Sequence, residues 1–204
     1  MANKSVKCGK LNISNTGPFT LIAGPCQLEN EKHSLDVATE LKRITDTNKA
    51  YIASIELGKT TNTLDPEGDV IEKKKIPRLN ESKINKVLKS FLGSSMQTPP
   101  MFSAKKIGGV KLYELARKNI VVDRKPTQIN ISDIRIINFN ETNIVFTVSC
   151  SKGTYIRVLG KEIAEKLGTV GHLDSLIRTR VGEYVIKDSV SLDQFKLSWK
   201  SYTH

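Results

Sequence analysis

The sequence contains few cysteines and no long apolar run. Three of its 204 residues are cysteine, Cys8, Cys26 and Cys150, and their spacing matches no metal-binding pattern. Such a sparse, odd set of thiols favours a reducing compartment over a disulfide-stabilised scaffold. The longest apolar run near the start, Phe19 to Ala23, is too short for a signal-peptide core or a membrane span. We therefore expect a cytoplasmic protein without a membrane partner.

Several motifs that carry chemistry are also missing. The sequence shows no nucleophilic triad, no zinc motif and no glycine loop of the kind that holds phosphates. His172 has no cysteine, aspartate or second histidine at ligand spacing, so we expect it to be structural. The sequence thus predicts no metal site.

Positive charge is present in excess and is unevenly distributed. The net charge is +11, of which residues 1–48 carry +1 and residues 49–204 carry +10. A basic excess confined to one part of a chain indicates a polyanionic partner, nucleic acid ahead of membrane. A basic protein with solvated lysines remains the alternative. The length fits one domain, or one domain plus a fragment, and a hydrophobic fraction of 38% supports a core.

Residues 1–48 predict a single β/α unit. Phe19 to Cys26 is typical of a short buried strand that ends at Gly-Pro, and Ser34 can cap the helix that follows. The apolar face of that helix consists of Leu35, Ala38, Leu41 and Ile44. One such unit cannot bury its own sheet face.

The amino-acid sequence of this segment resembles the N-terminal part of KDO-phosphate synthase. That enzyme is an eight-fold β/α barrel aldolase that joins phosphoenolpyruvate to arabinose phosphate. The resemblance rests on Asn12 to Asn15 and Pro18 to Glu29 and covers about the first 45 residues. In that family the cysteine matching Cys26 can bind a metal. The family's other ligands have no counterpart here, so we expect an inert thiol.

A second pattern begins at Lys49. Apolar residues alternate through Tyr51 to Leu57, as in a strand with one buried face, and Gly58 ends it. A turn-rich loop occupies 60–68, and Val70 and Ile71 start a return strand. Ser82 is expected to cap a helix that ends at Gly93 and has an apolar face made of Ile84, Val87, Leu88 and Phe91.

Residues 97–126 predict a projecting loop. Two prolines and two glycines surround a cluster of basic and aromatic residues. Basic side chains contact phosphates, and Phe102 or Tyr113 can pack or stack on a base. Packing of the short helix is the expected role of Leu112, Tyr113 and Leu115.

The last part predicts an antiparallel strand pair followed by a helix. Residues 129–137 and 144–150 are the strands, and 139–143 is the turn between them. The helix after Gly153 ends at Gly168 and buries Ile156, Leu159, Ile163 and Leu167. Arg157 lies beside this apolar stripe, near the helix start, where it can point to the sheet edge.

These segments resemble the TruB-type tRNA pseudouridine synthases over about residues 49–195. The matching motifs are Lys49 to Ala53, Thr61 to Gly68, Pro99 to Lys106, Leu112 to Arg117, Ser151 to Arg157 and Gly171 to Gly182. The resemblance implies an α/β (α+β) fold: a mixed, mostly antiparallel sheet with flanking helices and a thumb loop. It also implies isomerisation of a uridine in the tRNA T-loop to pseudouridine, with an aspartate nucleophile and no metal or organic cofactor.

The resemblance assigns roles to particular residues. Tyr51 is expected to stack on the target uracil, Leu176 to line its pocket, and Arg157 to pair with the catalytic aspartate. The thumb, about 97–126, is expected to grip the T-arm of tRNA. The expected RNA-binding residues are Lys105, Lys106, Lys111, Arg117, Arg124 and Lys152. Departures from the family pattern occur at Lys106, Gly108, Thr127 and Ile177.

The motif around Asp65 and its position in the chain point to different roles for this residue. Its Thr-Leu-Asp-Pro context resembles that of the catalytic aspartate, but the catalytic loop precedes the Tyr51 strand in the family, whereas Asp65 follows it. We therefore interpret Asp65 as a turn residue and assign no catalytic residue. Arg157 must then find another carboxylate, a phosphate or water.

The sequence as a whole predicts a monomeric chimera. Residues 1–48 are the aldolase-like fragment, and 49–204 are an N-terminally truncated synthase domain with no room for a C-terminal RNA-binding domain. Truncation is expected to leave sheet edges uncovered. Three functions remain open: a tRNA pseudouridine synthase, impaired by the missing aspartate loop; a non-catalytic RNA-binding protein; and a KDO-phosphate synthase relative.

Overall fold

The chain divides into two units, Met1–Arg43 and Ile44–His204. The computed structural model describes residues 5–8, 11–14, 31–194 and 197. In the first unit, strands β1 (Ser5–Cys8) and β2 (Leu11–Ser14) pair antiparallel as a hairpin that the sequence did not predict. The strand expected at 19–23 and Cys26 lie outside the described residues.

Helix α1 (Glu31–Thr45) begins three residues before its expected cap, Ser34. Of its expected apolar face, Leu35 is 66% exposed and Leu41 is 45% exposed. The helix is therefore present, but these two side chains are not buried among the described residues.

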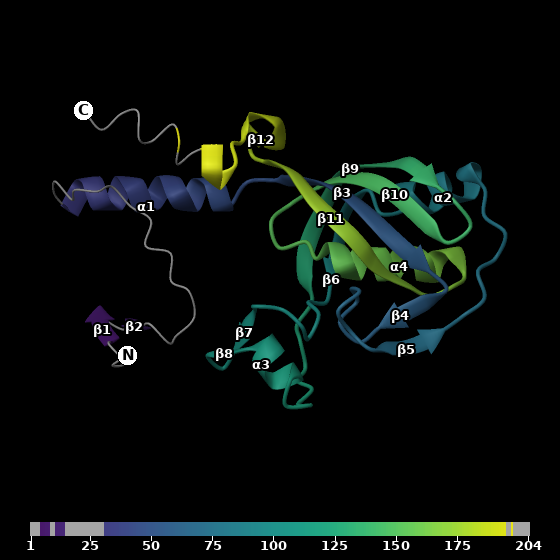
Figure 1. Cartoon of the computed structure of the whole chain (residues 1–204), viewed down its shortest axis with the longest axis horizontal. Helices are drawn as coiled ribbons and strands as arrows, with labels where there is room; N and C mark the ends of the chain where they lie inside the picture. Colours follow the sequence, from purple (N-terminus) through teal and green to yellow (C-terminus); the bar gives the residue numbers. More distant parts are fainter. Residues whose placement is uncertain (1–4, 9–10, 15–30, 195–196, 198–204) are drawn as a thin grey trace. The chain divides into compact units, whose positions relative to one another are not determined.

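The second unit is built on a six-stranded sheet (Figure 1). The strand order is β12-β11-β3-β10-β9-β6, and every neighbouring pair is antiparallel. The strands are β3 (Lys49–Leu57), β6 (Gly93–Gln97), β9 (Thr127–Phe139), β10 (Asn143–Cys150), β11 (Gly171–Val181) and β12 (Tyr184–Val185). The expected fold class, with a mostly antiparallel sheet, is confirmed.

Two short hairpins and two short helical turns project from this sheet. One hairpin is β4 (Lys59–Thr61) with β5 (Val70–Lys73), and the other is β7 (Lys106–Ile107) with β8 (Val110–Lys111). Helix α3 (Leu112–Ala116) follows β8, and a 3-10 turn, η1 (Ile186–Asp188), follows β12.

Helices α2 (Glu81–Lys89) and α4 (Ile156–Leu167) pack together and bury one face of the sheet. The expected alternation in β3 is confirmed, because Tyr51, Ala53, Ile55 and Leu57 are all buried. The four α4 residues expected in the core are also buried, and Gly168 ends the helix with φ +97°. Ser82 does not cap α2: Asn80 does, and its side chain accepts a 2.8 Å bond from the Lys83 amide.

Two glycines let α4 lie close to the sheet. A Cβ on Gly160 would lie 2.7 Å from Ile55 Cγ2, and one on Gly171 would lie 2.8 Å from Ala164 Cβ. Since real Cβ atoms do not approach that closely, a larger residue at either position would push α4 away from β3 and β11. These glycines thus set the distance between the sheet and the start of α4, which carries Arg157.

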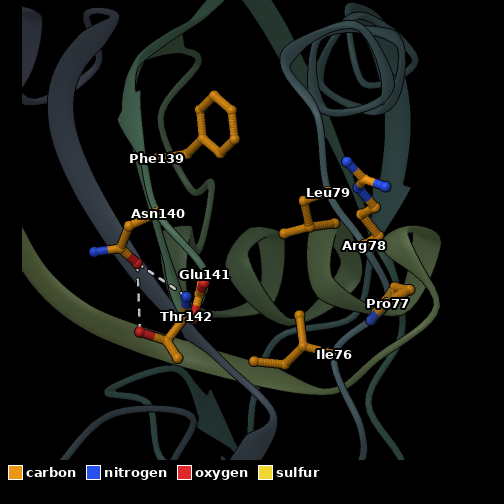
Figure 2. Close-up of a pocket in the computed structure, with 8 residues that line it drawn as sticks. All are labelled: Ile76, Pro77, Arg78, Leu79, Phe139, Asn140, Glu141 and Thr142. Atoms are coloured by element: carbon orange, nitrogen blue, oxygen red, sulfur yellow. Dashed lines mark hydrogen bonds between the residues drawn. The ribbon is translucent and has the colours of Figure 1, made fainter.

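A hollow of about 600 Å³ lies away from these residues. It separates the segment Ile76 to Leu79 from the β9–β10 turn, Phe139 to Thr142 (Figure 2). The Asn140 side chain closes that turn by accepting a 2.9 Å bond from the Thr142 amide. None of the residues expected to bind RNA or substrate lines this hollow.

No helix in the described part of the chain is long and apolar enough to cross a membrane.

Candidate functional site

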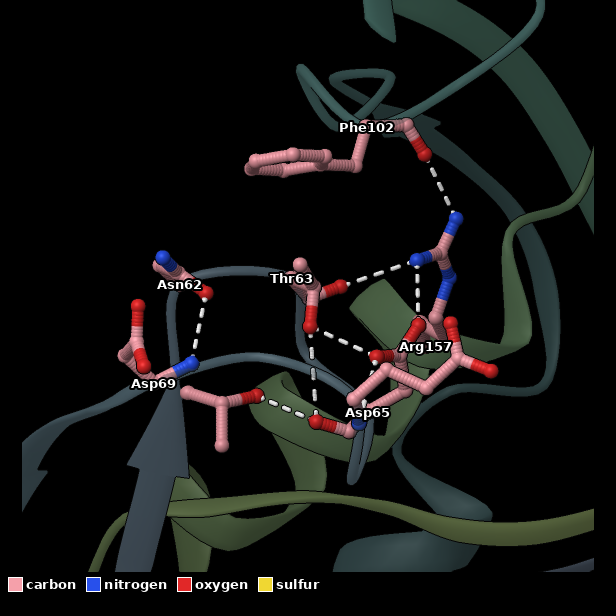
Figure 3. Close-up of polar contacts among 8 residues, drawn as sticks. Asn62, Thr63, Asp65, Asp69, Phe102 and Arg157 are labelled. Carbon is pink, nitrogen blue, oxygen red and sulfur yellow. Dashed lines mark hydrogen bonds and ion pairs between the residues drawn. The ribbon is translucent and has the colours of Figure 1, made fainter. Parts of the chain in front are cut away.

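Arg157 connects three segments that are distant in the sequence (Figure 3). Its Nη1 donates to Asp65 Oδ2 at 2.6 Å and to the Thr63 carbonyl at 2.9 Å, while Nη2 donates to the Phe102 carbonyl at 2.6 Å. The Arg157 and Asp65 side chains are 25% and 23% exposed. The guanidinium thereby holds the β4–β5 loop and the start of the thumb against α4.

The loop that carries Asp65 is closed by its own side chains. Thr63 Oγ1 donates to Asp65 Oδ1 at 2.6 Å, and the Glu67 amide donates to the same oxygen at 3.3 Å. Thr61 Oγ1 donates to the Asp65 carbonyl at 2.7 Å. Both carboxylate oxygens of Asp65 are therefore engaged, one within the loop and one with Arg157.

The backbone of this loop is tied to the sheet at Leu64. Leu64 has φ +64°, a left-handed conformation that is unfavourable for a leucine. Its carbonyl accepts a 3.0 Å bond from the Leu173 amide at the start of β11. Strain at Leu64 is thus offset by contacts that fix where the Asp65 carboxylate lies.

Asp65 lies in a turn, as its sequence context indicates, and its carboxylate is the partner of Arg157. The sequence alone does not identify this partner, which could be a carboxylate, a phosphate or water. The signal that pointed to Asp65 was its resemblance to the catalytic motif, which sequence order argued against.

Gln97 is a positioning residue that the sequence did not reveal. It is 2% exposed at the end of β6. Its amide nitrogen donates to the Tyr155 carbonyl at 3.2 Å, and its amide oxygen accepts from the Tyr155 amide at 2.8 Å. These two bonds fix the residue that precedes α4, and so set the direction in which Arg157 leaves the helix.

Tyr51 and Leu176 lie on the same face of the sheet. Leu176 pairs with Ala53 and Arg178 pairs with Tyr51, so all four point to the face that α4 covers. Tyr51 is only 8% exposed, and the Arg178 guanidinium lies 5.5 Å from its ring centre. Leu176 is 44% exposed. The Arg178 contact is a further feature that the sequence did not indicate.

The thumb is held at its base by hydrogen bonds and by one buried leucine. The Tyr113 amide donates to the Ser103 carbonyl at 3.1 Å, and Arg124 Nη1 donates to the Pro99 carbonyl at 3.1 Å. Leu112 is fully buried, in agreement with its expected packing role, while Tyr113 and Leu115 are half-buried.

The cations expected to bind RNA differ in their exposure and in their contacts with neighbouring side chains. Lys111 Nζ donates to the Tyr113 hydroxyl at 3.2 Å, a bond that raises the pKa of Lys111, and the Arg117 guanidinium lies 5.5 Å from the same ring. Lys106 is exposed, whereas Lys105 and Arg124 are half-buried. Lys152, outside the thumb, forms an exposed 2.9 Å ion pair with Asp46.

His172 is buried and structural, as expected. It is 2% exposed, and its Nδ1 lies 3.1 Å from the Lys59 carbonyl. Within the described residues, no group of three or more histidine, cysteine, aspartate or glutamate side chains is placed to hold a metal ion. Cys150 is buried, and burial raises the pKa of its thiol.

Comparison with known proteins connects this geometry to one family. Residues 35–156 match the model of the TruB family pseudouridylate synthase N-terminal domain. The match begins inside α1, fourteen residues before residue 49, where the resemblance was expected to start. It also includes Tyr51, Asp65 and the thumb, and it ends at Ile156, the first residue of α4.

Curated relatives carry the corresponding name. The chain is 45% identical over 147 residues to the tRNA pseudouridine synthase B of Psychrobacter cryohalolentis, covering 72% of this chain and 41% of that protein. It is 41% identical over 157 residues to the protein of the same name from Hydrogenovibrio crunogenus, covering 77% and 52%. The chain thus spans about half the length of the relatives it matches.

Solved structures share the fold. A chain of a Cbf5-Nop10-Gar1 complex matches with a TM-score of 0.56 at 24% identity, over 80% of this chain and 40% of that one. A chain of an H/ACA ribonucleoprotein bound to a substrate RNA containing 2'-deoxyuridine matches with a TM-score of 0.53 at 20% identity, over 84% and 40%.

Proposed function

Because this chain belongs to the TruB family of pseudouridylate synthases, we propose that it binds the T-arm of tRNA but does not itself isomerise uridine. The thumb and the start of α4 form the RNA-binding surface, and Tyr51 with Leu176 forms the place for a flipped uracil. No metal or cofactor takes part. The name of the relatives, tRNA pseudouridine synthase B, supports tRNA as the partner.

Charge supports the RNA-binding part of the proposal. Residues 49–204 carry a net charge of +10. Lysine and arginine side chains that neutralise phosphates give sequence-independent, salt-sensitive affinity. Lys105 precedes the β7–β8 hairpin, Lys106 is its first residue, and Arg117 directly follows α3, so all three cations belong to the thumb.

One observation carries the claim of inactivity: the carboxylate beside Arg157 is Asp65. Asp65 follows the Tyr51 strand, whereas the catalytic loop of the family precedes that strand, and an aspartate that acts as a nucleophile must also release hydrogen bonds to reach the sugar carbon. Asp65 uses Oδ1 to accept from Thr63 and Glu67 and Oδ2 to accept from Arg157. Its carboxylate connects the loop to α4, and breaking those hydrogen bonds lowers the free energy of unfolding.

The same ion pair favours a second candidate, an isomerase with Asp65 as its nucleophile. An arginine paired with the catalytic aspartate is what the family resemblance implies, and the 2.6 Å contact between Arg157 and Asp65 has that form. In this reading Asp65 swings away from Thr63 when the uracil enters.

Two measurements on the same protein test the proposal. We expect a gel shift of tRNA that weakens with salt and with Lys105→Ala and Lys106→Ala. We also expect no release of tritium from tRNA labelled at carbon 5 of its uridines. Tritium release that Asp65→Asn abolishes would establish the second candidate, and the absence of a shift at low salt would refute the RNA-binding proposal.

The chimeric origin of residues 1–45 remains a prediction. The family match begins at residue 35 and so already includes the last part of that segment. A KDO-phosphate synthase activity would form product from phosphoenolpyruvate and arabinose phosphate, and we expect none.

A further inference from the structure

The two edges of the sheet are protected to different degrees. At one edge, the two residues of β12 pair, in the described part of the chain, only with Arg180 and Val181 of β11, and the rest of β11 carries the charges of Asp174 and Arg178, which disfavour a further strand. At the other edge, β6 has five residues, Gly-Ser-Ser-Met-Gln, with no charge and no proline, and within the described residues it pairs only with β9. Long uncharged edges with free amide and carbonyl groups accept further strands.

A groove of about 490 Å³ runs beside this edge. One wall is β6 with the residues before it, including Phe91, Leu92 and Met96, and the other wall is α4. Leu92 is 47% exposed and Met96 is 63% exposed. A strand added to β6 would therefore cover exposed apolar surface as well as the backbone edge.

The α4 wall is acidic in a chain that is otherwise strongly basic. Glu162 and Glu165 both line the groove. Glu165 pairs with Lys161 at 3.2 Å, but Glu162 forms no ion pair or hydrogen bond with any described residue. Burial raises the pKa of Glu162, the Glu165 carboxylate raises it further, and Lys161 and Lys166 lower it by less.

The one cation in the lining is already engaged. Lys166 Nζ donates to Ser90 Oγ at 2.9 Å and lies 4.1 Å from the Phe91 ring centre. It thus leaves the Glu162 carboxylate exposed to whatever enters the groove. A lysine or arginine of an added strand would meet that carboxylate.

We propose that β6 is the docking edge for an extended segment of a partner protein, which adds as a seventh strand and places a lysine or arginine over Glu162. Alternate side chains of the added strand point toward α4, because side chains in a strand alternate between the two faces. The segment therefore has apolar residues at alternating positions with one basic residue among them. This inference does not rest on the proposed RNA function.

The test uses a short fluorescent peptide in which threonine and valine alternate and a central lysine replaces one valine. Its partner peptide has glutamate in place of the lysine. Fluorescence anisotropy with the full chain should show the lysine peptide binding at least about tenfold more tightly than the glutamate peptide. Glu162→Lys should reverse that preference, and Glu162→Gln should abolish it.

A matched control is Glu141→Lys, an exposed glutamate in the β9–β10 turn, which should leave the preference unchanged. Circular dichroism of each variant confirms that the sheet is intact. Absence of binding, or binding that ignores the peptide charge, would overturn the proposal. So would self-association of the unmodified chain that Met96→Lys disrupts, since a second copy would then occupy the edge.

Discussion

The β4–β5 loop and the thumb both contact Arg157, yet they are built differently. The loop is closed by hydrogen bonds from Thr61 and Thr63 to Asp65 and is tied to β11 through Leu64. The thumb is fixed near its base, at Pro99, Phe102 and Ser103, and by the buried Leu112, whereas its β7–β8 hairpin is exposed. The loop thus holds the arginine through a side-chain ion pair, whereas the thumb accepts from it through a backbone carbonyl and carries the cations.

The difference separates stability from binding. Residues of the loop should affect the free energy of unfolding and leave RNA affinity nearly unchanged. Lys105 and Lys106 of the thumb should affect RNA affinity and leave the free energy of unfolding nearly unchanged. Arg157, on α4, contacts both segments and should affect both quantities.

The largest effect is expected from Arg157→Met. It removes three charge-assisted hydrogen bonds and leaves the Asp65 carboxylate without its cation. Because both groups are about a quarter exposed, we expect a loss of about 2 kcal/mol in the free energy of unfolding. Urea denaturation measures it, with Arg157→Lys as the control that restores charge alone. A loss below about 0.5 kcal/mol would show that the contacts of Arg157 with the loop and the thumb do not stabilise the fold.

The double change Lys105→Ala with Lys106→Ala should weaken tRNA binding about tenfold, because two phosphate contacts are lost. The slope of log affinity against log salt should fall by about two. Filter binding at several salt concentrations measures both, and the midpoint of urea unfolding should not move. Lys86→Ala with Lys89→Ala on α2 makes the same charge change elsewhere. An equal loss for that control would assign the effect to net charge rather than to the thumb.

Asp65→Asn should cost about 1 kcal/mol of stability, since the ion pair becomes a neutral hydrogen bond while the shape is kept. Affinity for tRNA should stay within about twofold of the parent. Asp69→Asn is the matched control: the Asp69 amide donates to the Asn62 side chain, a bond that this substitution leaves intact. A tenfold change in affinity for Asp65→Asn alone would move Asp65 from the loop scaffold into the RNA site.

The smallest effect is expected from Lys152→Ala. Its ion pair with Asp46 is exposed, with side chains 58% and 43% accessible, so its removal should change the free energy of unfolding by less than about 0.5 kcal/mol. A larger loss would show that the segment before α4 depends on this pair.

Regular periodicity predicted much of the fold. The alternation in β3 and β10 and the apolar stripe of α4 all correspond to buried residues. Strand β11 was not predicted, because two bulges, between Leu173 and Ser175 and between Arg178 and Arg180, disturb its alternation. Strand β6 has too few β-branched residues to be recognised and is held in place by its partner β9.

Long-range pairing limited what could be predicted of the site. Arg157 and Asp65 are 92 residues apart, and no local pattern connects them. Gln97 and Tyr155 are 58 residues apart and have no sequence signature at all. The sequence does not distinguish Ser82 from Asn80 as the cap of α2, because serine and asparagine cap helices equally well, and only the fold selects Asn80.

Single-turnover tritium release tests the central claim most directly. The full chain, in excess over tRNA and at a concentration that fully shifts the tRNA, is incubated with tRNA tritiated at carbon 5 of its uridines. If the Asp65 carboxylate is a strut for Arg157, release should match that of the protein-free control. Release above that control, lost in Asp65→Asn while tRNA binding persists, would contradict the account and make Asp65 the nucleophile.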